Sequence, residues 1–332
     1  MRLRTRSARS RRYRLAGLAT ALAAVTVAGL VLAPGASAAS KPTTKPGTKA
    51  SSTTSTKTTT GPATVTVTTA SAPDSRALWV WDTSTPVETV DLAVSAGIDQ
   101  LFVAVPPNVT TSSQLPNLRT LSERARAAGI RVDALGGDPG WVDNASWVVT
   151  YWLKPARATG LFTGIHVDVE PYTTPAWTTS QSTVVTKYLK LLDTLKANAG
   201  SAPIEADIPF WFNGIPAKTS AGAASSLDRE IMRRTAGVTV MAYRNTAAGA
   251  DGTLALAAPA LTAGAALGKP VRIGQETTYL GDTAVDTKQT FFGWTRTAME
   301  GQLTQVTAGA ASQASFAGLA IHSAAGYAAM AP

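Results

Sequence analysis

Residues 164–172 read Gly-Ile-His-Val-Asp-Val-Glu-Pro-Tyr, so apolar and ionisable side chains alternate along this stretch. Because successive side chains of a β-strand point to opposite faces, the alternation predicts a strand with one apolar face and one face that carries His166, Asp168 and Glu170. Both faces of a parallel strand are normally buried, and an unpaired buried ion costs several kcal/mol, a large share of the roughly 5–15 kcal/mol that stabilises a domain. We therefore interpret this column as part of a catalytic site, with a structural ion-pair network as the alternative.

The chain around this strand alternates short runs of β-branched and aromatic residues with longer helical stretches, which is the pattern of a parallel sheet with crossover helices. Eight strands are predicted, at residues 78–82, 100–105, 131–135, 164–170, 204–211, 238–243, 271–276 and 318–322. Helices are predicted between them, at residues 114–128, 180–199, 227–235, 254–267 and 295–311. Eight strand–helix units within residues 75–332 predict an α/β fold, a single (β/α)8 TIM barrel, because this length is close to the usual ~250 residues. A doubly wound open sheet is the alternative, but no glycine-rich phosphate loop follows the first strand.

Residues 1–38 have the three parts of a secretory signal peptide, which predicts that the protein is exported. Seven arginines come first, an apolar run follows at residues 15–32, and Ala36-Ser37-Ala38 offers a cleavage site. Residues 10–15 resemble a twin-arginine signal, so this route and the general secretory route both fit, and an uncleaved membrane anchor is a further alternative. Residues 39–74 consist mainly of Ser, Thr, Lys and Pro, which predicts a flexible linker. We expect a secreted or cell-surface monomer with no membrane span after cleavage.

The net charge of +9 lies in the N-terminal segments rather than in the predicted barrel. Without the seven arginines and four lysines of residues 1–74, and without Asp74, the chain keeps 19 basic and 20 acidic residues. A near-neutral domain gives no electrostatic reason for a nucleic-acid partner. The absence of cysteine excludes disulfides and thiol nucleophiles, and two histidines are too few for a multi-histidine zinc site. Our leading hypothesis therefore includes no metal and no cofactor.

Polar and aromatic residues gather at the predicted carboxyl ends of the strands, where TIM barrels carry their active sites. Nine of them are predicted to bind substrate: Trp81, Asp82, Asp138, Trp141, Asp207, Trp211, Arg244, Asn245 and His322. Tryptophan faces suit stacking on pyranose rings, with ordinary packing as the alternative for each. Four ionisable residues lie deeper in their strands and are interpreted as ion pairs of the barrel lumen: Arg131, Asp133, Glu205 and Arg272.

Two carboxylic acids that flank a glycosidic bond are the minimum machinery for its hydrolysis. Glu170 is the predicted general acid, because it stands at the predicted tip of the fourth strand. Asp168, one layer below, is predicted to hold Glu170 by hydrogen bonding and to raise its pKa through like-charge proximity. Glu276, at the tip of the seventh strand, is the predicted second carboxylate.

The fourth-strand motif resembles that of family 18 chitinases, in which a strand-four Asp-x-Glu supplies the acid and its aspartate helper. Asp168 and Glu170 match these two positions, and Pro171-Tyr172 resembles the pair of residues directly after the acid in that family. Met241-Ala242-Tyr243 resembles the family's strand-six Met-x-Tyr, which implies that Tyr243 helps to orient a substrate acetamido group. The resemblance implies a TIM barrel that acts on a glycosidic bond.

The chain departs from the family 18 pattern at three positions. Thr163 and His166 stand where the longer family motif has two aspartates, and Arg244 replaces the acid of the sixth strand. Over its whole length the domain looks more like a group of secreted bacterial glycosidase-like barrels. The stretches that carry this wider resemblance are Trp79, residues 208–211, residues 273–277 and residues 320–322.

Three functions fit these observations. The leading hypothesis is a secreted glycoside hydrolase that acts on a cell-wall or environmental polysaccharide through Glu170 and Glu276. The second is a Mg²⁺- or Ca²⁺-dependent phosphodiester hydrolase or lyase, with metal ligands drawn from Asp133 or Asp138, Asp168 or Glu170, and Glu205 or Asp207. The third is a carbohydrate-binding barrel without catalysis, which the replacement at Arg244 suggests. Fold alone does not choose among them.

Overall fold

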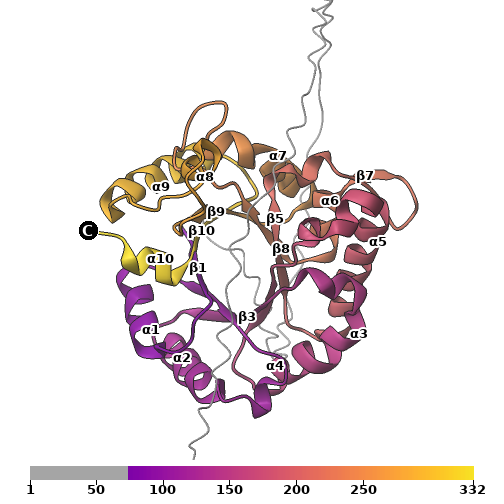
Figure 1. The fold of residues 1–332 in the computed structure, drawn as a ribbon, viewed down its shortest axis with the longest axis horizontal. Helices are drawn as coiled ribbons and strands as arrows, with labels where there is room; N and C mark the ends of the chain where they lie inside the picture. Colours follow the sequence, from indigo (N-terminus) through magenta and orange to yellow (C-terminus); the bar gives the residue numbers. More distant parts are fainter. Residues whose placement is uncertain (1–73) are drawn as a thin grey trace, which may run out of the picture. The chain divides into compact units, whose positions relative to one another are not determined.

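The computed structural model describes residues 74–332, and the predicted signal peptide and most of the predicted linker lie outside them. The described residues form a closed barrel of parallel strands in the order β1-β10-β9-β8-β5-β4-β3-β2, with helices around it (Figure 1). The barrel strands are β1 (Arg76–Val80), β2 (Gln100–Ala104), β3 (Arg131–Gly136), β4 (Gly164–Val167), β5 (Ile204–Pro209), β8 (Gly237–Met241), β9 (Val271–Glu276) and β10 (Phe316–His322). The predicted (β/α)8 fold is confirmed, and each of the eight predicted strands overlaps an observed one.

The helices lie outside the barrel strands (Figure 1). They are α1 (Pro86–Ser95), α2 (Leu115–Ala127), α3 (Ala145–Trp147), α4 (Lys154–Ala158), α5 (Pro175–Asn198), α6 (Leu227–Arg234), α7 (Thr253–Leu267), α8 (Ala284–Lys288), α9 (Arg296–Ala310) and α10 (Ala324–Ala329). The five predicted helices correspond to α2, α5, α6, α7 and α9. The hairpin of β6 (Pro216–Lys218) and β7 (Ala224–Ser226), which lies between β5 and α6, was not predicted.

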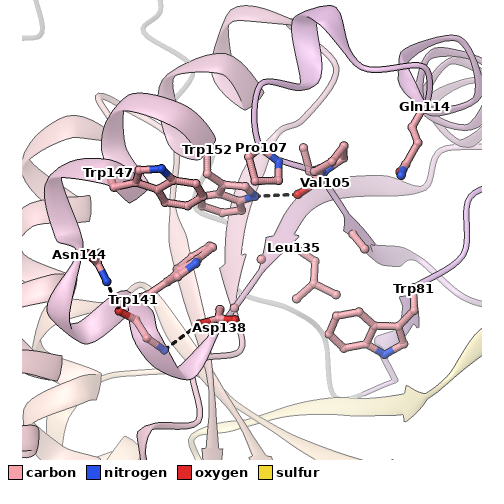
Figure 2. A pocket seen from close by; sticks show the side chains of 15 residues that line it. Trp81, Val105, Pro107, Gln114, Leu135, Asp138, Trp141, Asn144, Trp147 and Trp152 are labelled. Carbon is pink, nitrogen blue, oxygen red and sulfur yellow. Dashed lines mark hydrogen bonds between the residues drawn. The ribbon is translucent and has the colours of Figure 1, made fainter. Parts of the chain in front are cut away.

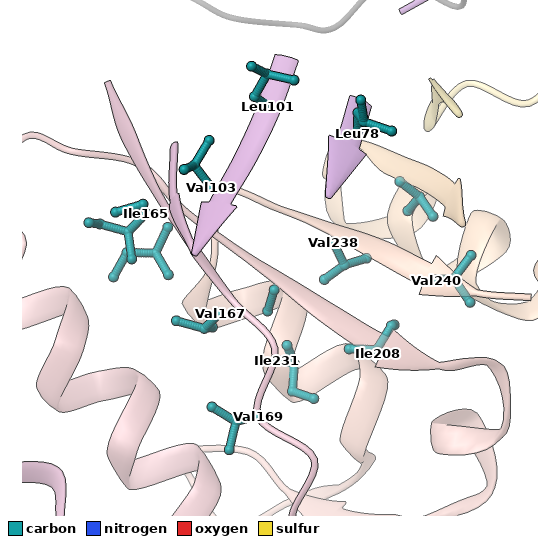
Figure 3. Close-up of a cluster of buried hydrophobic side chains, with 14 of the residues drawn as sticks. Leu78, Leu101, Val103, Ile165, Val167, Val169, Ile208, Ile231, Val238 and Val240 are labelled. Carbon is teal, nitrogen blue, oxygen red and sulfur yellow. The ribbon is translucent and has the colours of Figure 1, made fainter. Parts of the chain in front are cut away.

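The main hydrophobic core lies between the strands and the helices. Figure 3 shows Ile165, Val167 and Val169 in this core, together with apolar side chains of the neighbouring strands and of α6. The apolar half of the alternation at 164–172 therefore faces the helices, and the ionisable half faces the barrel lumen. Burial of apolar surface contributes about 25 cal/mol per Å², so this layer stabilises the barrel.

The lower part of the lumen holds the predicted ion pairs. Nη2 of Arg131 lies 3.0 Å from Oδ2 of Asp133 and 2.7 Å from Oε1 of Glu205. Nη1 of Arg272 lies 3.0 Å from Oε2 of Glu205, and Nε2 of Gln100 donates to Asp133. Burial alone would raise the pKa of Glu205, but Arg272 and Arg131 lower it to about 2. This network confirms the interpretation of the four deep residues as structural ion pairs.

Within residues 74–332, none of the helices combines the length and apolar character that a membrane crossing requires. β10 ends at a cis peptide bond between His322 and Ser323.

Candidate active site

The ionisable column of residues 166–170 rises through the lumen and out of the barrel mouth. β4 ends at Val167, three residues before its predicted end, because the chain turns at Pro171 into a short 3₁₀ helix. The backbone N–H of Asp168 still donates to the carbonyl of Gly136 on β3, at 3.0 Å. Glu170 therefore stands in the turn just beyond the strand, close to the position that the sequence predicted for a general acid.

His166 and Asp207 form the layer below this turn. Nε2 of His166 lies 2.8 Å from Oδ1 of Asp207, and the indole N–H of Trp79 donates to Oδ2 of Asp207 at 3.1 Å. The ring of His166 stacks on Phe102, with 3.6 Å between ring centroids. Both oxygens of the buried Asp207 are therefore occupied by protein groups, so its predicted substrate contact stays a prediction, whereas its negative charge acts on the carboxylates above it.

Asp168 and Glu170 both favour the protonated state. Burial raises the pKa of Asp168 well above its usual value, and Asp207 and Glu170 raise it further. Burial also raises the pKa of Glu170, whereas the hydrogen bond from Tyr172 lowers it and Asp207 raises it. Oδ1 of Asp168 is buried and has no hydrogen-bond partner among the described residues. A general acid needs a proton near neutral pH, and the upward shift of the Glu170 pKa is in the direction that this role requires.

Tyr172 fixes the carboxyl group of Glu170 from the side. Its hydroxyl donates a hydrogen bond to Oε1 of Glu170. The Tyr172 ring packs edge-on against Trp211, with 5.2 Å between centroids, and against Trp177 and Phe212. Trp211, predicted to bind substrate, thus supports Tyr172, and any substrate contact of Trp211 stays a prediction. No role was predicted for Tyr172. Pro171, which turns the chain directly after Glu170, is the sequence feature that could have indicated the contact between Tyr172 and Glu170.

Glu276 lies at the end of β9, which β5 and β8 separate from β4 in the barrel, and both of its oxygens have protein partners. Oε1 accepts hydrogen bonds from the backbone N–H groups of Thr277 and Thr278 and from the hydroxyl of Thr278, at 2.6–2.8 Å. Oε2 lies 2.8 Å from Nδ1 of His322. The two residues are direct neighbours in the β9–β10 register. Glu276 therefore positions His322, and its predicted role as the second catalytic carboxylate stays a prediction.

Tyr243, two residues beyond the end of β8, lies close to His322. Its ring lies 6.4 Å from that of His322, and burial followed by the charges of Glu276 and Asp207 raises the pKa of its hydroxyl well above the usual value. The hydroxyl is thus a hydrogen-bond donor at any physiological pH. This property suits the orienting role that the family resemblance implies for Tyr243.

Three other predicted substrate-binding residues have loop partners. Arg244 donates to Oδ1 of Asp251 through Nε and Nη2, at 3.0 and 2.8 Å, and to the carbonyl of Tyr243. The amide of Asn245 donates to two carbonyls, those of Thr287 in α8 and of Thr290 just after it. Asp82 is exposed and accepts from the backbone N–H of Ser84. These contacts brace loops at the mouth, and the structure does not bring the three side chains into contact with Glu170.

A cavity of about 730 Å³ opens beside the carboxylates, over the ends of β1, β2 and β3. In Figure 2 Trp81 faces this cavity from one side, and Trp141 and Trp147 line the other. The exposed fractions of Trp81 and Trp147 are 43% and 41%, so their faces are open to a ligand. Trp152 is buried behind them and donates its indole N–H to the carbonyl of Val105 at 2.9 Å. Trp147 and Trp152 were not among the predicted binding residues, because their segment does not lie at the carboxyl end of a predicted strand.

The cavity and the carboxylates adjoin each other without overlapping. Gly137 lines the cavity, and a β-carbon at this position would lie 1.8 Å from the carbonyl oxygen of Asp168. Trp81 lines the cavity and donates to Nε2 of His322 at 2.7 Å. Asp138, the only charged residue of the lining, accepts from the N–H of Gly140. We refer to this cavity as the tryptophan groove. An oligosaccharide bound in the tryptophan groove would extend to one side of Glu170.

Among residues 74–332, no group of three or more histidine, aspartate or glutamate side chains is arranged to hold a metal ion. The candidate ligands Asp133 and Glu205 are engaged by Arg131 and Arg272, and Asp207 is engaged by His166 and Trp79. These three carboxylates are thus held by protein groups, and the metal-dependent alternative stays a prediction.

No protein-family model and no curated protein sequence matches the chain. Among solved structures, a mutant GH18 chitinase from Cycas revoluta in complex with (GlcNAc)4 has a TM-score of 0.52 and 13% identity, over 75% of this chain and 95% of the other. A plant class V chitinase mutant from Cycas revoluta in complex with (GlcNAc)3 has a TM-score of 0.50 and 15% identity, over the same shares of the two chains. The barrel is similar in fold to family 18 chitinases. At this identity the likeness shows the fold and no more.

Proposed function

We propose that the protein is a glycoside hydrolase in which Glu170 is the general acid. One observation carries this proposal: a half-buried carboxyl group with a raised pKa stands at the barrel mouth, is held by Tyr172, and adjoins a groove lined by tryptophans. Such a group can protonate the leaving oxygen as the glycosidic bond breaks, which is the role of a general acid in glycoside hydrolysis. The structural neighbours bind oligosaccharides in barrels of the same fold, which supports the same class of substrate here.

In the proposed mechanism each residue of the cluster has one role. Glu170 transfers its proton to the leaving oxygen, and Tyr172 holds the resulting carboxylate by a hydrogen bond. Asp168 stays protonated beneath Glu170, so that two adjacent negative charges do not form. Tyr243 donates a hydrogen bond to the bound sugar. Glu276 is the second carboxylate of the paired mechanism, and to attack directly its Oε2 has to leave His322, since Oε1 already accepts three hydrogen bonds.

The lining of the tryptophan groove favours an uncharged polysaccharide. Lys and Arg do not occur among the lining residues, and Asp138 would repel an acidic sugar. The faces of Trp81 and Trp147 suit the apolar faces of pyranose rings. A volume of about 730 Å³ lies within the usual range of ligand sites, about 300–1,000 Å³. We propose a neutral glycan of the cell wall or the environment as the substrate.

The test is hydrolysis of a panel of polysaccharides, comprising chitin oligomers, mannan, xylan and an acidic polymer such as a polyuronate. We expect reducing ends to be released from a neutral member of the panel, and none from the same substrate with Glu170→Gln. Activity confined to the polyuronate would refute the neutral-glycan proposal. The same assay with EDTA separates the metal-dependent alternative, since a two-carboxylate enzyme is indifferent to a chelator.

A carbohydrate-binding barrel without catalysis is the second candidate, and Arg244 supports it. This residue stands at the position of the strand-six acid and is committed to Asp251. Binding to a neutral polysaccharide by calorimetry, without release of reducing ends over a long incubation, would favour this candidate. A parallel binding measurement on each polymer of the panel therefore belongs to the same experiment.

We further propose that residues 1–38 direct export and that residues 39–74 link the barrel to its site of action. Secretion of the wild-type chain, and its retention in the cell when residues 1–38 are deleted, would support this proposal. A chain that begins at Ser75 should fold and keep full activity, because β1 begins at Arg76. Loss of the soluble fold in that chain would contradict the domain boundary.

A further inference from the structure

Trp81 is tied to His322, the last residue of β10. The indole Nε1–H of Trp81 donates a hydrogen bond to Nε2 of His322 at 2.7 Å, across 241 residues of sequence. Trp81 is nevertheless 43% exposed and lines the tryptophan groove. One edge of the indole is therefore held by a titratable ring, and its face is open to a ligand.

The contacts of His322 define its protonation state in this arrangement. An indole nitrogen is a donor only, so Nε2 of His322 must accept and carries no proton. Nδ1 lies 2.8 Å from Oε2 of Glu276, whose other oxygen accepts three hydrogen bonds. The proton of a neutral His322 therefore sits on Nδ1. If His322 were doubly protonated, its Nε2–H would face the Nε1–H of Trp81, and two donors would meet without an acceptor.

Charged and titratable groups from several elements face His322. Glu276 lies on β9, Asp207 on β5, Glu170 beyond β4, and Tyr243 beyond β8. Burial lowers the pKa of His322, but Glu276, Asp207 and Glu170 raise it, and the net shift is upward from the usual value. The rings of Trp79 and Trp81 complete the surroundings, with centroids 5.5 and 5.9 Å from that of His322. The acids thus favour the charged ring, whereas the hydrogen bond from Trp81 favours the neutral ring.

We propose that His322 is a positioning residue that holds Trp81 at the edge of the tryptophan groove when it is neutral and releases Trp81 when it is protonated. Loss of the Nε2 acceptor removes the hydrogen bond and puts two donors 2.7 Å apart, so the indole has to move. Glu276 sets the pH of this change by stabilising the protonated ring. We call this pH-dependent hydrogen bond between Trp81 and His322 the latch. The latch does not depend on catalysis, but its effect on sugar binding rests on the proposed function.

The direct test follows the indole N–H signals by NMR in the full chain labelled with ¹⁵N-tryptophan, between about pH 5 and pH 9. The chain has eight tryptophans, and a Trp81→Phe variant identifies the signal of Trp81. We expect this signal to shift in a single titration step as pH falls. Trp152 is the matched control, because it lines the same groove and its indole donates to a backbone carbonyl that does not titrate.

Two variants assign the titration step to His322. His322→Gln retains an acceptor but no titrating ring, so the step at Trp81 should disappear. Glu276→Gln removes a negative charge beside the ring, so the step should move to lower pH. A Trp81 signal that does not titrate in the wild-type chain overturns the proposal without any variant. A step that persists in His322→Gln, or that Trp152 shares, also overturns it.

A binding measurement extends the test to the groove, with (GlcNAc)4 as the probe. A lost aromatic contact weakens binding by about 2- to 12-fold. We expect this loss in the wild-type chain below the titration step, and a similar pH-independent loss in Trp81→Phe. If the NMR step is present but (GlcNAc)4 does not bind at any pH, the pH-dependent contact between His322 and Trp81 stands, and chitin oligomers are excluded as the neutral glycan of the proposed function. If (GlcNAc)4 binds with the same affinity on both sides of the step, the role of Trp81 in the groove is overturned.

Discussion

The hydroxyl of Tyr172 donates a hydrogen bond to Oε1 of Glu170, and the Tyr172 ring is enclosed by Trp177, Trp211 and Phe212. This contact opposes the effect of burial on the carboxyl group, since burial raises the pKa of Glu170 and the hydrogen bond lowers it. Burial and the hydrogen bond from Tyr172 are the two largest of the opposing influences on the pKa of the proposed acid. The second can be removed by deleting a single oxygen atom.

Tyr172→Phe should shift the alkaline limb of the pH–activity profile to higher pH. A general acid works only while protonated, so activity is lost as pH rises through its pKa, and removal of the hydrogen bond raises that pKa. The measurement is kcat/KM against pH. Tyr327→Phe is the matched control, because it removes another tyrosine hydroxyl that donates to a glutamate, Glu300 at 2.8 Å, outside the site. An unchanged alkaline limb in Tyr172→Phe would show that Glu170 is not the acid.

Asp168→Asn should increase the free energy of unfolding near neutral pH. The folded protein holds the pKa of Asp168 well above its unfolded value, so above the unfolded pKa of about 3.9 the native state binds more protons and loses stability as pH rises. Asparagine does not ionise, so this loss disappears in the variant. Urea denaturation at pH 7 and pH 4 measures both effects. We expect the free energy of unfolding of the variant to exceed that of wild type at pH 7, and the difference to shrink at pH 4. A variant that is less stable than wild type at pH 7 would contradict the electrostatic account.

Gly137→Ala should lower both stability and activity. The added β-carbon would lie 1.8 Å from the carbonyl oxygen of Asp168, so the backbone between groove and carboxylates has to shift, at a cost of about 1–3 kcal/mol. Gly301→Ala is the control, since a β-carbon there meets nothing within 4 Å and lies inside α9. That change should stabilise the protein by roughly 0.5–1 kcal/mol. The melting temperatures of the two variants measure both effects. Equal changes in melting temperature would show that the Asp168 carbonyl does not exclude a side chain at residue 137.

The barrel was predictable from the sequence because each of its strands is a short β-branched or aromatic run between helical stretches. The helical segment at residues 145–158 was not predicted, because part of it has the composition of a strand. Residues 148–153 read Val-Val-Thr-Tyr-Trp-Leu, a composition typical of strands, but they form a π-helical turn that buries Val148, Trp152 and Leu153. Tertiary packing thus outweighed local propensity.

The candidate site was predictable only where its residues share one strand. Asp168 and Glu170 follow from the two-residue period of residues 164–172. The contacts of His322 with Glu276 and Trp81 depend on the register of β9 and β10 and on barrel closure between β10 and β1, which no local pattern encodes. The aromatic support of Tyr172 depends in the same way on the packing of the segment after β5 against the turn after β4.

The central claim is that Glu170 supplies the proton to the leaving group. The most direct test compares Glu170→Gln and Glu276→Gln with wild type on aryl glycosides whose leaving groups differ in acidity. We predict that Glu170→Gln lowers kcat by about 10²–10⁴ for poor leaving groups and far less for good ones, which need no proton. Glu276→Gln, if it is the second carboxylate, slows every substrate alike. A loss in Glu170→Gln that is the same for all leaving groups, or that is absent, would contradict the assignment of Glu170 as the general acid.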